Sequence, residues 1–175
     1  MRRICGIALA LLLLLTAHAR ILAGELNLTI LHTNGVHSRL AATPPFGSEC
    51  NAQHISENKC LGGAARLAGA IAAIRAEGGH VVLLVAGDQF QGTLFFTYYS
   101  GQAAAQVMTR FGYDAMALGN HEFDDGPETL GRFAERIDFP LLAANIDVSA
   151  KPHLAGEWRP GRCSNLVARN LASSA

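Results

Sequence analysis

Two short segments carry residue types that bind metal ions and transfer protons. Residues 86–92 read AGDQFQG and residues 118–124 read LGNHEFD, and each follows a short apolar run. Such a run is typical of a buried strand, and open α/β sheets bind their ligands where strands end. A third segment, residues 31–37, reads LHTNGVH and follows the first apolar run after the N-terminal region. The three segments predict one site built from loops that are distant in sequence.

The segments resemble the motifs of the calcineurin-like metallophosphoesterases, and more closely those of the secreted 5'-nucleotidase/apyrase family. The resemblance covers about residues 26–144, and the three motifs occur in the family's order. The second and third motifs match without visible departure. The first motif departs at one position, because Gly35 stands where the family's Asp-x-His pattern has a carboxylate.

The resemblance implies a site for two divalent metal ions, which in such enzymes lie about 3.5 to 4 Å apart and polarise a phosphate. His37, Asp88 and Asn120 would supply an imidazole nitrogen, a bridging carboxylate and an amide oxygen. His121 would face the phosphate, and Asp124 would orient its imidazole. A mixed nitrogen and oxygen ligand set selects loosely among metals, so zinc, manganese, magnesium and calcium all remain candidates.

The implied activity is hydrolysis of phosphate from extracellular nucleotides, with a small nucleotide as the partner molecule. Family members continue further, with two more metal-binding histidines and a C-terminal domain that grips the base. We therefore expect this chain to be the first part of the catalytic domain, truncated before its second half. Gly35 and the short tail predict impaired activity, and the alternative is a non-catalytic secreted protein that retains weak metal or nucleotide binding.

The segments between the motifs alternate between strand and helix patterns. Apolar residues recur at helical spacing after each expected strand, as in Leu130, Phe133, Ala134 and Ile137. Strands separated by helices predict an α/β domain with parallel pairing and right-handed crossovers. We expect this domain over residues 25–150, followed by an irregular tail at 151–175. The expected strands are 26–31, 81–86, 115–118 and 141–144.

The N-terminus and the cysteines indicate secretion. Residues 1–23 combine Arg2 and Arg3, a following apolar run and a small-x-small pattern, as in a secretory signal peptide. The apolar run is too short to span a bilayer, which requires about 20 residues. Cys50 and Cys60 bracket a polar loop and are expected to form a disulfide in an oxidising compartment. A zinc knuckle that uses His54 is the rival interpretation, although no fourth ligand has suitable spacing.

The charge pattern argues against other partners. The chain has 14 basic and 14 acidic residues and a formal net charge of zero. Nucleic-acid binding is therefore disfavoured, because it depends on clustered cations. The sequence shows no C-terminal apolar tail that would signal a lipid anchor, so we expect no membrane anchor in this chain. Its oligomeric state cannot be inferred from the sequence.

Overall fold

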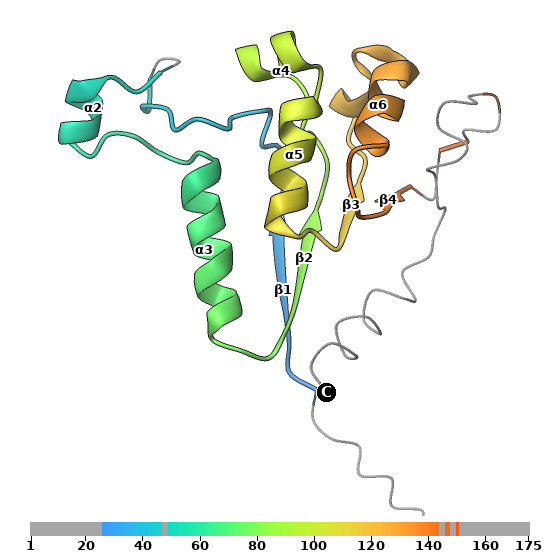
Figure 1. Ribbon diagram of the computed structural model, residues 1–175, viewed down its shortest axis with the longest axis horizontal. Helices are drawn as coiled ribbons and strands as arrows, with labels where there is room; N and C mark the ends of the chain where they lie inside the picture. Colours follow the sequence, from blue (N-terminus) through green and yellow to red (C-terminus); the bar gives the residue numbers. More distant parts are fainter. Residues whose placement is uncertain (1–25, 47–48, 144–145, 148–149, 151–175) are drawn as a thin grey trace, which may run out of the picture.

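The computed structural model describes residues 26–46, 49–143, 146–147 and 150 (Figure 1). The predicted signal peptide at 1–23 and the predicted tail at 151–175 lie outside the described residues. No helix in the described part of the chain is long and apolar enough to cross a bilayer.

Four parallel strands form one sheet, in the order in which they occur along the chain. This confirms the predicted α/β class and parallel pairing. The ends of the strands lie within about two residues of their predicted positions. Parallel pairing brings the carboxyl ends of the strands to one edge of the sheet (Figure 1). The strands are β1 (Leu28–Thr33), β2 (His80–Val85), β3 (Ala115–Ala117) and β4 (Leu141–Leu142).

Three helices form the crossovers that the apolar spacing predicted. They are α3 (Ala64–Ala76), α5 (Gln102–Phe111) and α6 (Gly126–Ala134). Each connects neighbouring strands in the same direction, so right-handed crossovers place all three on one face of the sheet. They contact one another in chain order, α3 with α5 and α5 with α6 (Figure 1).

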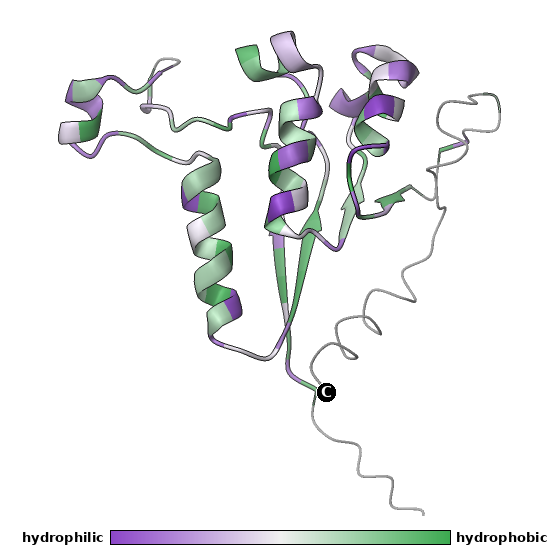
Figure 2. Cartoon of the chain, in the orientation of Figure 1, coloured by the Kyte–Doolittle hydropathy of each residue, from purple (hydrophilic) through white to green (hydrophobic). Residues whose placement is uncertain are grey.

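The hydrophobic core lies between the sheet and these helices. Val85, Met116 and Leu141 are paired across β2, β3 and β4 and are buried on this face. Leu130 and Phe133 of α6 are fully buried against them. Burial of each such side chain contributes about 1.5 to 3 kcal/mol, so this layer holds the strand ends in fixed positions. Figure 2 shows the strands as mainly hydrophobic, whereas α5 and α6 have mixed surfaces.

Three short helical elements were not predicted from the sequence. They are α2 (Ala52–Ser56), α4 (Leu94–Tyr99) and the 3-10 helix η1 (His121–Phe123). Each is too short to show a helical apolar period. Local capping explains two of them: Asn51 and His54 form a capping box at α2, and the Thr93 hydroxyl accepts a hydrogen bond from the Phe95 amide at α4. The polar loop expected between the cysteines therefore contains a helix.

Candidate metal centre

The first motif is attached to the second by backbone hydrogen bonds that extend the β1–β2 pairing beyond the strand ends. The amides of Gly35, His37 and Ser38 donate to the carbonyls of Gly87, Asp88 and Gln89, at 3.1, 3.0 and 2.9 Å. This pairing sets His37 beside Asp88.

The backbone turns sharply at both of these residues. The φ angles of His37 and Asp88 are +49° and +57°, in the left-handed region that non-glycine residues seldom adopt. Such backbone conformations cost free energy and occur most often at functional sites, where the surrounding structure holds them in place. The paired loops provide this support here.

The second and third motifs approach each other through two glycines. A Cβ atom on Gly87 would lie 2.5 Å from the amide nitrogen of Gly119, and a Cβ atom on Gly119 would collide with the carboxylate of Asp88. Side chains at either position would therefore force the loops apart. The close approach lets Asp88 Oδ1 accept a hydrogen bond from the His121 amide at 3.3 Å.

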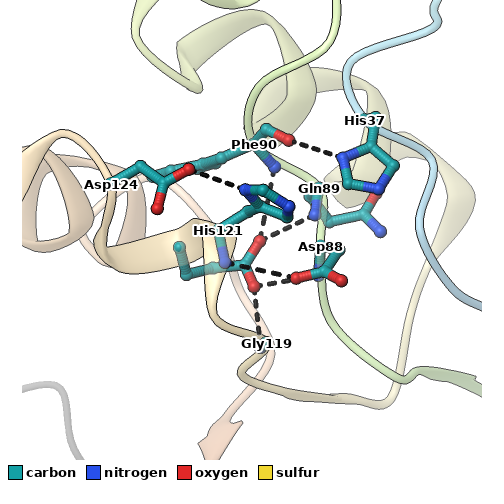
Figure 3. Close-up of polar contacts among 8 residues, drawn as sticks. His37, Asp88, Gln89, Phe90, Gly119, His121 and Asp124 are labelled. Carbon is teal, nitrogen blue, oxygen red and sulfur yellow. Dashed lines mark hydrogen bonds and ion pairs between the residues drawn. The ribbon is translucent and has the colours of Figure 1, made fainter.

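These loops bring together His37, Asp88 and His121, whose donor atoms all lie within 4.8 Å of one another (Figure 3). The Nδ1 atom of His37 lies 3.1 Å from the Phe90 carbonyl oxygen. Because a carbonyl oxygen can only accept, Nδ1 carries the proton and Nε2 of the neutral ring keeps its lone pair. Two imidazoles and one carboxylate are a donor set that suits zinc and other divalent transition metals, so the three residues could hold a metal ion.

The imidazole of His121 contacts a carboxylate of the third motif. Its Nδ1 lies 2.6 Å from Asp124 Oδ2, so Nδ1 donates to the carboxylate and Nε2 is left for the site (Figure 3). The hydrogen bond that His121 donates to Asp124 is the main cause that raises the pKa of His121 above its ordinary value. Partial desolvation opposes this shift, and the charges of Asp124, Asp88 and Glu122 add smaller increases to the pKa. The arrangement favours a proton on His121.

The structure also places the two remaining positions of the predicted site. A Cβ atom on Gly35 would lie 3.5 Å from Nε2 of His37, so a side chain at this position would lie beside the free nitrogen of the ring. Asn120 immediately precedes His121, is exposed, and does not cap η1 with its side chain. The cluster of histidine and carboxylate donors includes His121, which the motif resemblance assigned to the phosphate. The division between ligands and phosphate-facing groups remains a prediction.

One residue of the site was missed from the sequence. Glu122 is completely buried, and its carboxylate accepts hydrogen bonds from backbone amides of the second and third motifs. Its position beside His121 in the third motif was the one signal in the sequence that Glu122 could belong to the site. However, acidic residues are seldom fully buried, and the sequence pattern did not indicate this burial.

The predicted disulfide is present. Cys50 and Cys60 are bonded, with their Cα atoms 6.0 Å apart, and the bond closes the segment that contains α2. Cys60 is buried, and the Arg66 guanidinium of α3 donates to its carbonyl oxygen. The disulfide therefore stabilises the segment that connects the first motif to α3. Arg66 has a structural role in the same segment.

Comparison with known proteins places this geometry in a family. Residues 28–162 match the calcineurin-like phosphoesterase model. The chain is 51% identical to the 5'-nucleotidase of Bos taurus over 131 residues, which are 74% of this chain and 22% of that protein. It is 47% identical to the snake venom 5'-nucleotidase of Gloydius brevicauda over 125 residues, covering 71% of this chain and 20% of that protein.

Solved structures show the same relationship. The 5'-nucleotidase precursor from Thermus thermophilus matches with a TM-score of 0.65 and 38% identity, covering 75% of this chain and 24% of that chain. The NAD nucleotidase from Haemophilus influenzae matches with a TM-score of 0.63 and 33% identity, covering 75% of this chain and 23% of that chain. The chain thus spans less than a quarter of the length of these relatives. The matched family model, together with the parallel sheet and its three convergent motifs, shows that this chain belongs to the calcineurin-like phosphoesterase family.

Proposed function

We propose that this chain supplies the first three motifs of a metal-dependent phosphohydrolase that removes phosphate from nucleotides. The observation that carries the proposal is the convergence of His37, Asp88 and His121 at the carboxyl edge of the sheet. The relatives named above as 5'-nucleotidases support a nucleotide as the substrate. The predicted signal peptide, the disulfide and the similarity to a snake venom protein support secretion.

In this proposal His37, Asp88 and Asn120 hold divalent metal, and His121 with Asp124 serves the phosphate. Bound divalent metal supplies positive charge that polarises the phosphate and makes water a better nucleophile near neutral pH. The protonated Nδ1 of His37 keeps its Nε2 available as a ligand. Asp88 presents its carboxylate from a loop that is fixed on both sides by the first and third motifs.

His121 acts on the phosphate through its Nε2 atom. Its Nδ1 proton is held by Asp124, which fixes the ring and favours the charged imidazolium. In that form the Nε2 proton can stabilise the charge that develops on phosphate oxygens, or pass to the leaving oxygen as its bond to phosphorus breaks. The carboxylate of Asp124 balances the charge of the imidazolium.

Gly35 weakens this site. A carboxylate at position 35 would lie next to Nε2 of His37 and would add negative charge where a cation is held. Without it, we expect weak metal binding and low turnover in the natural chain. The same observation favours the second candidate, a secreted protein that keeps the fold and binds metal or nucleotide without catalysis.

Phosphate release from AMP and ATP, measured with added zinc, manganese, magnesium or calcium, tests the proposal. We expect release near background for the natural chain and higher, metal-dependent release for Gly35→Asp. The double variant Gly35→Asp/His121→Ala should lose that gain, whereas the control Gly35→Asp/His32→Ala should keep it, because His32 is exposed on β1. Absence of metal-dependent release in Gly35→Asp would favour the non-catalytic candidate. Robust turnover by the natural chain that His121→Ala abolishes would show that Gly35 does not impair the site.

A further inference from the structure

Glu122 is a carboxylate without solvent exposure between the second and third motifs. Its Oε1 accepts from the amides of Gln89 and Phe90, at 2.7 and 3.3 Å. Its Oε2 accepts from the amides of Asp88 and Gly119, at 2.9 and 2.8 Å. A carboxylate offers about four acceptor positions, so these four donors satisfy it.

Building on the proposed metal-dependent function, we propose that Glu122 is the positioning residue that locks the second motif to the third, and thereby sets the distance between Asp88 and His121. All four of its hydrogen bonds come from backbone amides. It acts on them through the backbone.

The second motif presents a concave row of amides to this carboxylate. Three successive amides, of residues 88–90, point at Glu122 because Asp88 adopts a left-handed conformation. Successive backbone N–H groups in such a turn form an anion-binding concavity, which in many proteins receives a phosphate or another external anion. Here an internal carboxylate fills it. The bound charge favours the turn that aims the Asp88 side chain at His37 and His121.

The third motif is held by the same group. The Gly119 amide shares Oε2 with the Asp88 amide, so one oxygen atom bridges two loops. The loops can come this close only because Gly87 and Gly119 have no side chains. The direct contact between the Asp88 carboxylate and the His121 amide, at 3.3 Å, is long and weak on its own. Glu122 thus supplies the stronger set of bonds that fixes the geometry of the donor cluster.

Glu122→Gln removes the charge and replaces one oxygen with an NH2 group, which cannot accept from the two amides it would face. Glu135→Gln is the matched control, because Glu135 undergoes the same change of charge at an exposed position after α6. Both variants and the natural full chain are compared in two measurements. The first is amide hydrogen exchange of the metal-free proteins, and the second is Mn²⁺ affinity by calorimetry under conditions where each protein is folded.

We expect Glu122→Gln to lose exchange protection at Asp88, Gln89 and Gly119 while the amides of β2 keep theirs. Its Mn²⁺ affinity should fall by about 10 to 100-fold, the usual effect of removing a group that orients metal ligands. Glu135→Gln should match the natural chain in both measurements.

Unchanged exchange and affinity in Glu122→Gln would overturn the proposal, and so would a uniform rise in exchange across the sheet, because that indicates general destabilisation. If Glu122→Gln does not fold, Glu122→Asp replaces it. The aspartate keeps the charge but is one methylene shorter, so it should lose part of the same protection and affinity. A natural chain that binds no Mn²⁺ would contradict the proposed function, whereas the exchange pattern would still show whether Glu122 joins the two loops.

Discussion

Replacement of Gly35 by aspartate should tighten the binding of divalent metal by at least tenfold. Position 35 lies beside the free nitrogen of His37, because a Cβ atom on residue 35 would be 3.5 Å from Nε2 of that ring. A carboxylate at position 35 would therefore join the donor cluster. Changes to groups that merely orient metal ligands already alter affinity or activity by about 10 to 100-fold. A directly coordinating carboxylate should have at least this effect.

The backbone opposes part of this gain. The φ angle of Gly35 is +52°, and a left-handed conformation costs an L-residue about 1 to 2 kcal/mol, least for aspartate and asparagine. The metal-free variant should therefore be less stable by about 1 kcal/mol. Tenfold tighter binding corresponds to about 1.4 kcal/mol, so at saturating metal the variant should become at least as stable as the natural chain.

Calorimetric titration with Mn²⁺ measures the change in metal affinity. Urea unfolding with and without metal measures the change in stability. Gly35→Asn is the matched control, because its side chain has nearly the same size and tolerates the same backbone conformation but carries no charge. It should show the same loss of stability without a comparable gain in affinity. Equal affinities for the natural chain and Gly35→Asp would refute the inference that position 35 faces the metal.

Three further predictions concern the disulfide, the contact between His121 and Asp124, and the glycine contact. Replacing Cys50 and Cys60 by serine should lower the free energy of unfolding by about 2 to 3 kcal/mol for a loop of this length, and an unchanged urea midpoint would argue against a stabilising role. Asp124→Asn should lower the pKa of His121, as measured by NMR titration of the metal-free protein. Because the pKa of His121 is raised in the folded state, this contact stabilises the fold below the unfolded-state pKa, and the contribution disappears as the pH rises through the folded-state pKa. A loss of stability in Asp124→Asn that is confined to alkaline pH would contradict this prediction. Gly119→Ala should weaken Mn²⁺ binding more than Gly69→Ala, since Gly69 lies in α3 with open space around its Cβ position, and equal affinities would show that the loops can separate without loss.

The sequence predicts the framework of this domain well because its signals are local. Apolar runs and helical spacing identify the four strands and the three crossover helices, and the polar residues after each strand identify the loops that meet. The pairing of Cys50 with Cys60 follows from their position around one polar segment. These features depend on neighbours in the chain.

The fine structure of the site depends on contacts between distant segments and could not be predicted in the same way. The role of Glu122 rests on four amides, three of them more than thirty residues away, and on complete burial that its residue type does not suggest. The left-handed turns at His37 and Asp88 likewise depend on the backbone pairing between the first and second motifs. The motif resemblance singles out Gly35 from the sequence, and the structure adds that a side chain at this position would lie beside Nε2 of His37.

Selective paramagnetic broadening by Mn²⁺ tests the central claim most directly, because it reports which amides surround a bound ion. Substoichiometric Mn²⁺ added to the isotopically labelled chain should broaden amide signals in three segments that are distant in sequence, 35–38, 87–90 and 119–122, before others. Asp88→Asn should reduce the effect in all three segments together. Broadening confined to a single segment, or centred on acidic residues elsewhere on the surface, would contradict a shared metal site formed by the three motifs.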